Sequence, residues 1–180
     1  MKRLFSIPIL ASILILGVFA IGLSFDDAEA KKDKGIGSIE VGDEIIIKGK
    51  GTGICTSGDD SGTVKANVRF LLLVEEADGD ISNGVAKAQI KLQTKCEGAP
   101  KTFENDGALA FTLDKDNGIL TMSGDLKARD GTIYSLDVIG QVNEGKKTTI
   151  DMSFVVHEIP TGITFEIPIL GGVIMMPITS

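Results

Sequence analysis

The sequence predicts an all-β fold, a single antiparallel meander of about eight strands that closes as an up-and-down barrel or as a flattened barrel close to a sandwich. Apolar and polar residues alternate with a period of two through most of the chain, which is typical of strands with one buried and one wet face. No stretch after residue 30 carries a helical period. Turn sequences rich in Asp, Asn and Gly separate the alternating runs.

The alternation first appears at residues 44–50, where Ile45 and Ile47 share one face. Residues 63–75 follow, with an apolar side chain at every second position and the polar Lys65, Asn67 and Arg69 between the first of them. Residues 86–93 repeat the pattern with alanine, isoleucine and leucine set against lysine and glutamine. We therefore expect three successive strands, each with one face in the core.

Five more alternating runs complete the expected sheet, at residues 109–113, 120–126, 134–142, 150–156 and 163–169. Short turns join most neighbours, and longer loops are expected at residues 77–84 and 97–106. Every connection fits a hairpin, and none demands a Greek-key crossover. A meander of this size removes its exposed edges by closing. A barrel is therefore favoured over an immunoglobulin-like sandwich, which would also want the Trp that this chain lacks.

The first thirty residues have the order of a signal peptide. Lys2 and Arg3 precede an uncharged apolar run at residues 4–25, and Ala28-Glu29-Ala30 supplies a small-x-small cleavage site. We expect cleavage after Ala30. The expected organisation is a signal peptide at residues 1–30, a polar linker at residues 31–37 and a single all-β domain at residues 38–180.

The apolar run at residues 4–25 also has the length of a membrane anchor, because its 22 residues at about 1.5 Å each reach roughly 33 Å. An uncleaved N-terminal anchor is therefore the alternative to cleavage. In both cases we expect the domain to be secreted or extracytoplasmic, and bound to a membrane only through residues 4–25 if the leader is retained.

The exported part of the chain is mildly acidic. Taking the leader's two basic and three acidic residues from the totals of 18 and 25 leaves 16 basic and 22 acidic residues, a net charge of −6. No basic stripe stands out along the sequence, so we expect no nucleic-acid partner. Mild acidity favours solubility and indicates nothing more specific.

The two cysteines, Cys55 and Cys96, are an even count in an oxidising compartment, so we expect one disulfide between them. Closing a loop of that length stabilises the fold by roughly 4 kcal/mol in the chain-entropy model. On a meander, both cysteines fall near the same end of the sheet, after the first and the third strand. Next-nearest strands are roughly 10 Å apart, so the loops must lean over the strand between them.

Small residues recur on the expected inner face, at Ala66, Ala86, Ala88, Gly124 and Gly140. An eight-stranded barrel can hold one small ligand, and small inner residues favour that use. The other interpretation is that they let large neighbouring side chains interdigitate, or that the glycines mark bends.

Ile46, Leu71 and Leu73 are expected to project outward from two adjacent strands, and they form a candidate interaction patch. Exposed apolar patches of this sort usually mark a surface that something covers. The candidate covers are the C-terminal segment at residues 171–176, a second copy of the chain, and a membrane surface. The tail and self-association are favoured.

The sequence singles out no catalytic, cofactor-binding or metal-binding residue. A single histidine, His157, excludes a His-rich zinc or copper site, and no Gly-x-Ser-x-Gly motif frames a serine. Residues 78–84 place oxygen ligands as a calcium loop does at positions one, three and five, but lack its Gly at six and its Glu at twelve. Asp114 and Asp116 form a shorter acidic turn. We expect no cofactor.

Three functions remain open. The first is an exported non-catalytic β-protein with a structural or interaction role at the cell surface, whose partners are other copies or another surface protein. The second is a carrier of a small apolar ligand inside the barrel, and the least favoured is a hydrolase or isomerase using carboxylates in the barrel mouth. The topology is similar to that of the lipocalins, but their Gly-x-Trp signature is absent, so the resemblance implies architecture alone.

Overall fold

The computed structural model describes residues 35–176 except 106, 108, 160 and 161. The expected signal peptide, its cleavage site and the alternative anchor lie outside these residues. The described part contains a short 3₁₀ helix, η1 (Ile36–Ser38), and nine strands. The strands are β1 (Glu44–Ser57), β2 (Asp60–Asp78), β3 (Ile81–Thr94), β4 (Thr102–Asn105), β5 (Leu109–Asp114), β6 (Ile119–Ala128), β7 (Ile133–Asn143), β8 (Thr149–Glu158) and β9 (Thr164–Met175).

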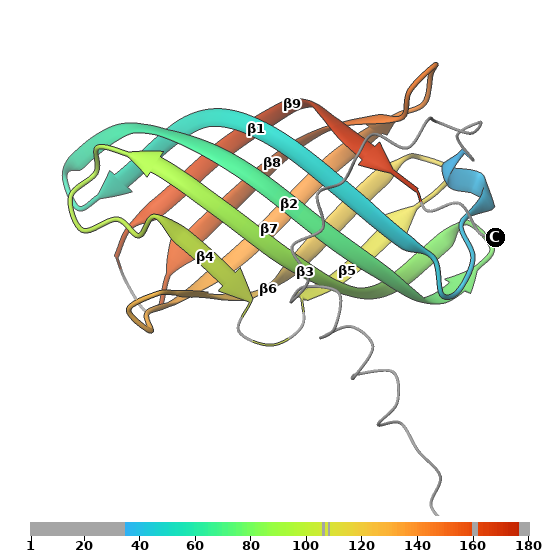
Figure 1. Cartoon of the computed structure of the whole chain (residues 1–180), viewed down its shortest axis with the longest axis horizontal. Coiled ribbons are helices and arrows are strands. Elements are labelled where there is room, and N and C mark those ends of the chain that lie inside the picture. Colours follow the sequence, from blue (N-terminus) through green and yellow to red (C-terminus); the bar gives the residue numbers. More distant parts are fainter. Residues whose placement is uncertain (1–34, 106, 108, 160–161, 177–180) are drawn as a thin grey trace, which may run out of the picture. The chain divides into compact units, whose positions relative to one another are not determined.

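The strands form one antiparallel sheet that closes on itself (Figure 1). β9 pairs with β1 and completes the ring. β4 and β5 share one place, because both pair with β3 on one side and with β6 on the other. The predicted all-β meander is therefore confirmed, with eight places around a ring that is less regular than an ideal barrel.

Asn105 stabilises the interruption between β4 and β5 through hydrogen bonds to β3. Its side-chain nitrogen donates to the carbonyl oxygen of Ala86 at 2.9 Å, and its side-chain oxygen accepts from the N–H of Ala88 at 2.5 Å. The Asn105 amide thus satisfies backbone groups of β3 at the place where its neighbouring strand is interrupted.

Several strands differ in extent from the sequence prediction. β1 continues to Ser57, well past residue 50, through a segment in which glycine replaces apolar residues at alternate positions. The loop expected at residues 77–84 is only a tight turn, because β2 runs to Asp78 and β3 begins at Ile81. The loop expected at residues 97–106 contains β4, which is too short for an alternation to be recognised.

The core is the inside of the ring, and one end of it is closed by η1. Ile36 and Ile39 are both buried and pack against β-strand residues such as Ile45 and Ile174. The N–H of Ile36 donates to the Glu144 carboxylate at 2.7 Å, which fixes η1 to the turn between β7 and β8. The packed domain therefore includes Ile36, which lies within the segment expected to be a linker.

The small inner residues make room for large ones. A Cβ on Gly140 would lie 2.7 Å from Cδ1 of Ile150, so the space beside Gly140 is already occupied. Ala66, Ala86 and Ala88 are buried in the same core as the phenylalanine side chains. The apolar cavity beneath η1 has a volume of only about 10 Å³. This space is too small for an apolar ligand.

Candidate interaction surface

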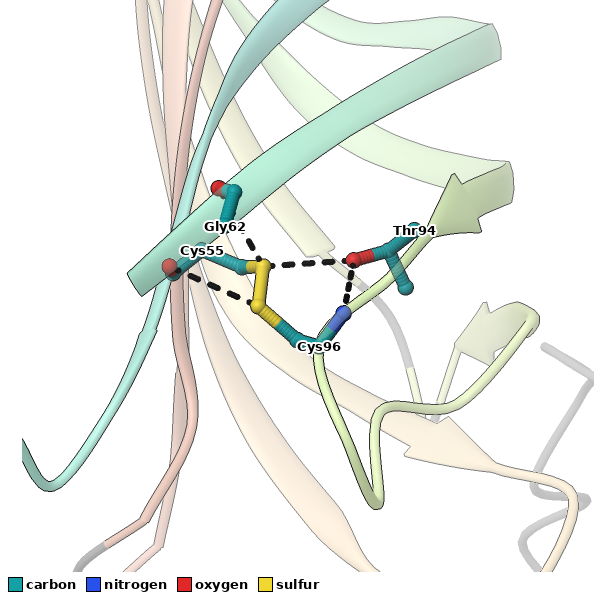
Figure 2. The surroundings of a disulfide bond; sticks show 4 residues. All are labelled: Cys55, Gly62, Thr94 and Cys96. Atoms are coloured by element: carbon teal, nitrogen blue, oxygen red, sulfur yellow. Dashed lines mark hydrogen bonds between the residues drawn. A yellow bond between two sulfur atoms is a disulfide. The ribbon is translucent and has the colours of Figure 1, made fainter. Parts of the chain in front are cut away.

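The disulfide between Cys55 and Cys96 joins β1 to the residues that follow β3, with a Cα–Cα distance of 6.5 Å. β2 lies between β1 and β3 in the sheet, and Gly62 of β2 is the residue paired with Cys55. Figure 2 shows the bond with Gly62 on one side and Thr94 on the other. The sulfur atoms therefore cross over β2, as the strand spacing required.

Gly62 is what makes this crossing possible. A Cβ at residue 62 would lie 3.1 Å from Sγ of Cys96 and 3.5 Å from Sγ of Cys55. Thr94 supports the bond from the other side: its hydroxyl oxygen accepts from the N–H of Cys96 at 3.0 Å and lies 3.2 Å from Sγ of Cys55. The disulfide is thus a packed structural element of the fold.

The candidate patch of Ile46, Leu71 and Leu73 lies on the outer wall, and each side chain is half-buried. Ile46 and Leu71 are cross-strand partners. The segment at residues 171–176 does not cover them, because residues up to Met175 continue β9 and pair with β1. The tail interpretation is therefore wrong: Met175 is paired with Ile46 and, being 36% exposed, adds to the patch.

A basic surface lies beside this patch. Away from their ends, β1, β2 and β3 contain no Asp or Glu, and their outward positions carry six basic side chains. Lys48 is paired with Arg69, and Asn67 is paired with both Lys50 and Lys91. We call this set the basic face: Lys48, Lys50, Lys65, Arg69, Lys87 and Lys91.

The opposite wall of the ring has the opposite charge. β6, β7, β8 and β9 contain five acidic residues and one basic residue, Lys127. Asp137 and Glu166 lie in one cross-strand row, on either side of Val155. We call this set the acidic face: Asp125, Asp137, Asp151, Glu158 and Glu166. With eight places in the ring, β2 lies across from β7, so the two faces point in opposite directions.

Two members of the acidic face also have structural roles. The Asp151 carboxylate accepts from the N–H of Gly171 at 2.6 Å and from the Asn143 amide at 3.2 Å, which supports the irregularity in β9. The Glu158 carboxylate accepts from the N–H of Ile163 at 3.0 Å and supports the turn between β8 and β9.

His157 lies on the outer wall of β8 and is half-buried. Its Nδ1 is 2.7 Å from the hydroxyl oxygen of Thr164 on β9. Within the described residues, no three His, Cys, Asp or Glu side chains come together in a way that could hold a metal ion. The calcium-like segment is a tight turn followed by β3, and its Ser82 is fully buried in the wall, away from exposed Asp78 and Asp80.

The acidic turns nevertheless meet at one end of the ring. The N–H of Lys115 donates to the carbonyl oxygen of Asp80, and the charge of Asp80 raises the pKa of Asp116. The neighbouring Asp114 has a lowered pKa, because the Asn117 side chain and backbone N–H donate to its carboxylate. Asp80 and Asp116 are exposed, and Asp114 is half-buried beside its partner Asn117.

Tyr134 is the one aromatic hydroxyl in the chain, and it is buried in β7. Its ring packs edge-on against Phe103 of β4 with the centroids 4.9 Å apart. Burial raises the pKa of Tyr134 to about 12, with smaller contributions from the charges of Glu158 and Asp130. Among the described residues the buried polar side chains are Ser82 and Thr148, so no carboxylate is buried in the described interior.

No protein-family model, curated protein or solved structure matches this chain. In the described part of the chain, no helix has the length and apolar character needed to cross a membrane.

The sequence analysis did not predict the basic face or the acidic face, because both depend on which strands lie side by side. The basic residues are scattered over forty-odd positions and alternate with apolar residues, so they form no stripe along the chain. A signal was present: apart from Glu44 and Glu75 at their ends, three consecutive alternating segments carry only basic charges on the polar side. Consecutive strands of a meander lie side by side, so these charges had to gather on one wall.

Proposed function

We propose that this chain is an exported, non-catalytic β-protein with a structural or interaction role at the cell surface, and that it meets its partners through the outer wall. The observation that supports this most strongly is the contrast between the inside and the outside of the ring. The cavity under η1 measures only about 10 Å³, whereas the outer wall carries a basic face, an acidic face and exposed apolar side chains.

The disulfide supports an extracytoplasmic location, since such bonds persist in oxidising compartments. The leader pattern at residues 1–30 independently supports export, because it has the order of a signal peptide. If cleavage after Ala30 does not occur, residues 4–25 would serve as the anchor. Neither observation specifies a partner. The charged faces of the outer wall are what supports contact with another protein.

Native mass spectrometry of the protein purified from its own cell envelope tests the proposal, with the denatured sample as the control. We expect a polypeptide mass that begins at Lys31, with no small molecule that leaves on denaturation. A stoichiometric small molecule would instead favour the carrier. Titration with an apolar fluorescent dye is the second measurement, and saturable binding to the folded protein would contradict a filled interior.

A further inference from the structure

We propose that the basic face of one copy of this protein binds the acidic face of a second copy, so that copies associate head to tail. This inference rests on the proposed function, because it takes the outer wall as the working surface. It assigns the partner: another copy of the same chain.

Charge complementarity is the first argument. Lys50 and Lys91 lie on either side of Asn67 in one cross-strand row, so like charges gather on the basic face. Lys50, Lys65 and Lys91 are exposed on the same wall. Asp125, Asp137 and Glu166 are exposed on the acidic face. Bringing the two faces together adds attraction between them, which offsets the repulsion among like charges within each face.

The apolar side chains beside the charges are the second argument. The basic face adjoins Ile46, Leu71 and Leu73, which are half-buried in one copy alone. On the acidic face, Ile139 is 61% exposed and lies two residues after Asp137 on the same side of β7. Each face therefore offers apolar contact area as well as charge, which is the combination that protein interfaces use.

The third argument is that both faces contain a shallow groove lined by polar side chains. A groove of about 370 Å³ on the basic face is lined by Lys50, Lys65, Asn67 and Gln93, whose side chains can donate hydrogen bonds to a carboxylate. A groove of about 330 Å³ at the edge of the acidic wall, over β5, β6 and β7, is lined by Asp137, Ser123 and two threonines, whose oxygens can accept from an ammonium group. Each groove suits the charged group that the other face presents.

The position of the faces determines the type of assembly. They lie on opposite walls, so a contact between two copies leaves one basic and one acidic face open. Such a heterologous contact produces an open chain or a ring rather than a closed dimer. Three strands about 4.8 Å apart and about 33 Å long provide roughly 470 Å² of wall. This is less than the roughly 800 Å² per partner of a standard stable interface. The contact should therefore be weak and sensitive to salt.

A second copy accounts for more of the surface than an anionic polymer does. A polymer bearing phosphate or carboxylate groups would use the basic face alone and leave the acidic face without a role. A second copy uses both faces of the molecule at once.

The test is sedimentation velocity on protein expressed from the full chain, at concentrations from about 10 μM to about 1 mM, the range for weak contacts. We expect the average mass to rise with concentration. Raising NaCl from about 50 to about 500 mM should weaken the association roughly tenfold. Two face variants, K50E/K65E and D137K/E166K, should each remain monomeric. K146E/K147E, in the exposed turn between β7 and β8, changes the net charge as K50E/K65E does and should associate like the wild type.

Mixing the two face variants is the decisive measurement. The mixture should associate, because the reversed basic face of one variant then meets the reversed acidic face of the other. A wild type that remains monomeric throughout, or face variants that associate as the wild type does, would overturn the proposal. A monomeric wild type that binds polyphosphate through Lys50 and Lys65 would overturn it in favour of a polyanion. None of these results alters the native-mass test, so failure here and failure of the proposed function are distinguishable.

Discussion

β1 and β9 are neighbours in the ring, and they contribute unequally to the core. β9 points Phe165, Ile167 and Ile169 inward, all fully buried. β1 has glycine at three successive inner positions, Gly49, Gly51 and Gly53. A Cβ on Gly49 would lie 2.5 Å from Cγ2 of Ile169, and one on Gly51 would collide with the carbonyl oxygen of Pro168. The isoleucines of β9 thus occupy the space that the glycines of β1 leave.

This difference shows how the two neighbouring strands share the space inside the ring. Because β1 and β9 are adjacent in the sheet, the large inner side chains of β9 lean over the glycines of β1 and occupy the space beside them. It also shows where each strand gets its stability. β9 is held by burial of its side chains, whereas the glycine-rich half of β1 buries little and ends in the disulfide at Cys55.

The largest effect is expected from the large-side-chain part of the core. Phe154 of β8 is fully buried. Phe154→Ala should lower the free energy of unfolding by roughly 4–5 kcal/mol, because it removes buried apolar area and leaves a cavity. Urea unfolding followed by circular dichroism measures this loss. The control is Ser153→Ala, on the outer face of the same strand, which should change little.

Removing the disulfide tests how much it contributes to holding the glycine-rich half of β1. C55S/C96S should lower the free energy of unfolding by about 4 kcal/mol, because the reduced chain gains loop-closure entropy on unfolding. The same urea experiment measures it, with the wild type in reductant as the matched control. Unchanged stability in both samples would mean that β1 is held by its pairing alone.

The glycine positions of β1 offer a third test. Gly51→Ala should destabilise by roughly 2 kcal/mol, because the added methyl group must push β9 away. The matched control is Gly145→Ala, where a Cβ would meet only the Lys147 carbonyl oxygen, at 3.7 Å. If Gly51→Ala unfolds at the wild-type urea concentration, then close approach of β1 and β9 is not what requires glycine there.

The smallest expected effect on stability comes from Tyr134, and it is seen only at high pH. Because burial raises the pKa of Tyr134 to about 12, the folded protein holds this proton more tightly than the unfolded chain does. Stability from this group is full below the ordinary phenol pKa of about 10 and is lost as the pH rises from there towards 12. The chain has one Tyr and no Trp, so ultraviolet absorbance follows this phenol alone. A folded-state midpoint equal to that in urea would contradict its burial.

Most of the sheet could be predicted because each strand has a local signature. Residues 134–142 and 150–156 keep an apolar residue or glycine at every second position, and both became strands with the expected inner faces. The exceptions have physical causes. In β1 after Lys50 the inner positions are glycines, so hydrophobic periodicity is lost although the strand continues. β4 is only four residues long and follows Pro100.

The candidate surface was predicted in part. Parity placed Ile46, Leu71 and Leu73 on the outer wall, and the structure confirms that placement. The role given to residues 171–176 was wrong, because Gly171, with φ of +64°, allows an irregularity after which Val173 and Met175 resume the outer positions of β9. Alternation alone cannot place such an extra residue, since it shifts the parity of everything after it.

The sequence by itself determined the all-β class, the strand order of a meander and the pairing of the only two cysteines. The class follows from local periodicity and the strand order from the short turns. The pairing follows because the chain has only two cysteines. The tertiary structure decided that β9 closes on β1, that the glycines of β1 receive the isoleucines of β9, and that basic and acidic residues separate onto opposite walls. Closure and register are pairings between distant segments, and they depend on how the whole ring packs, which no local pattern contains.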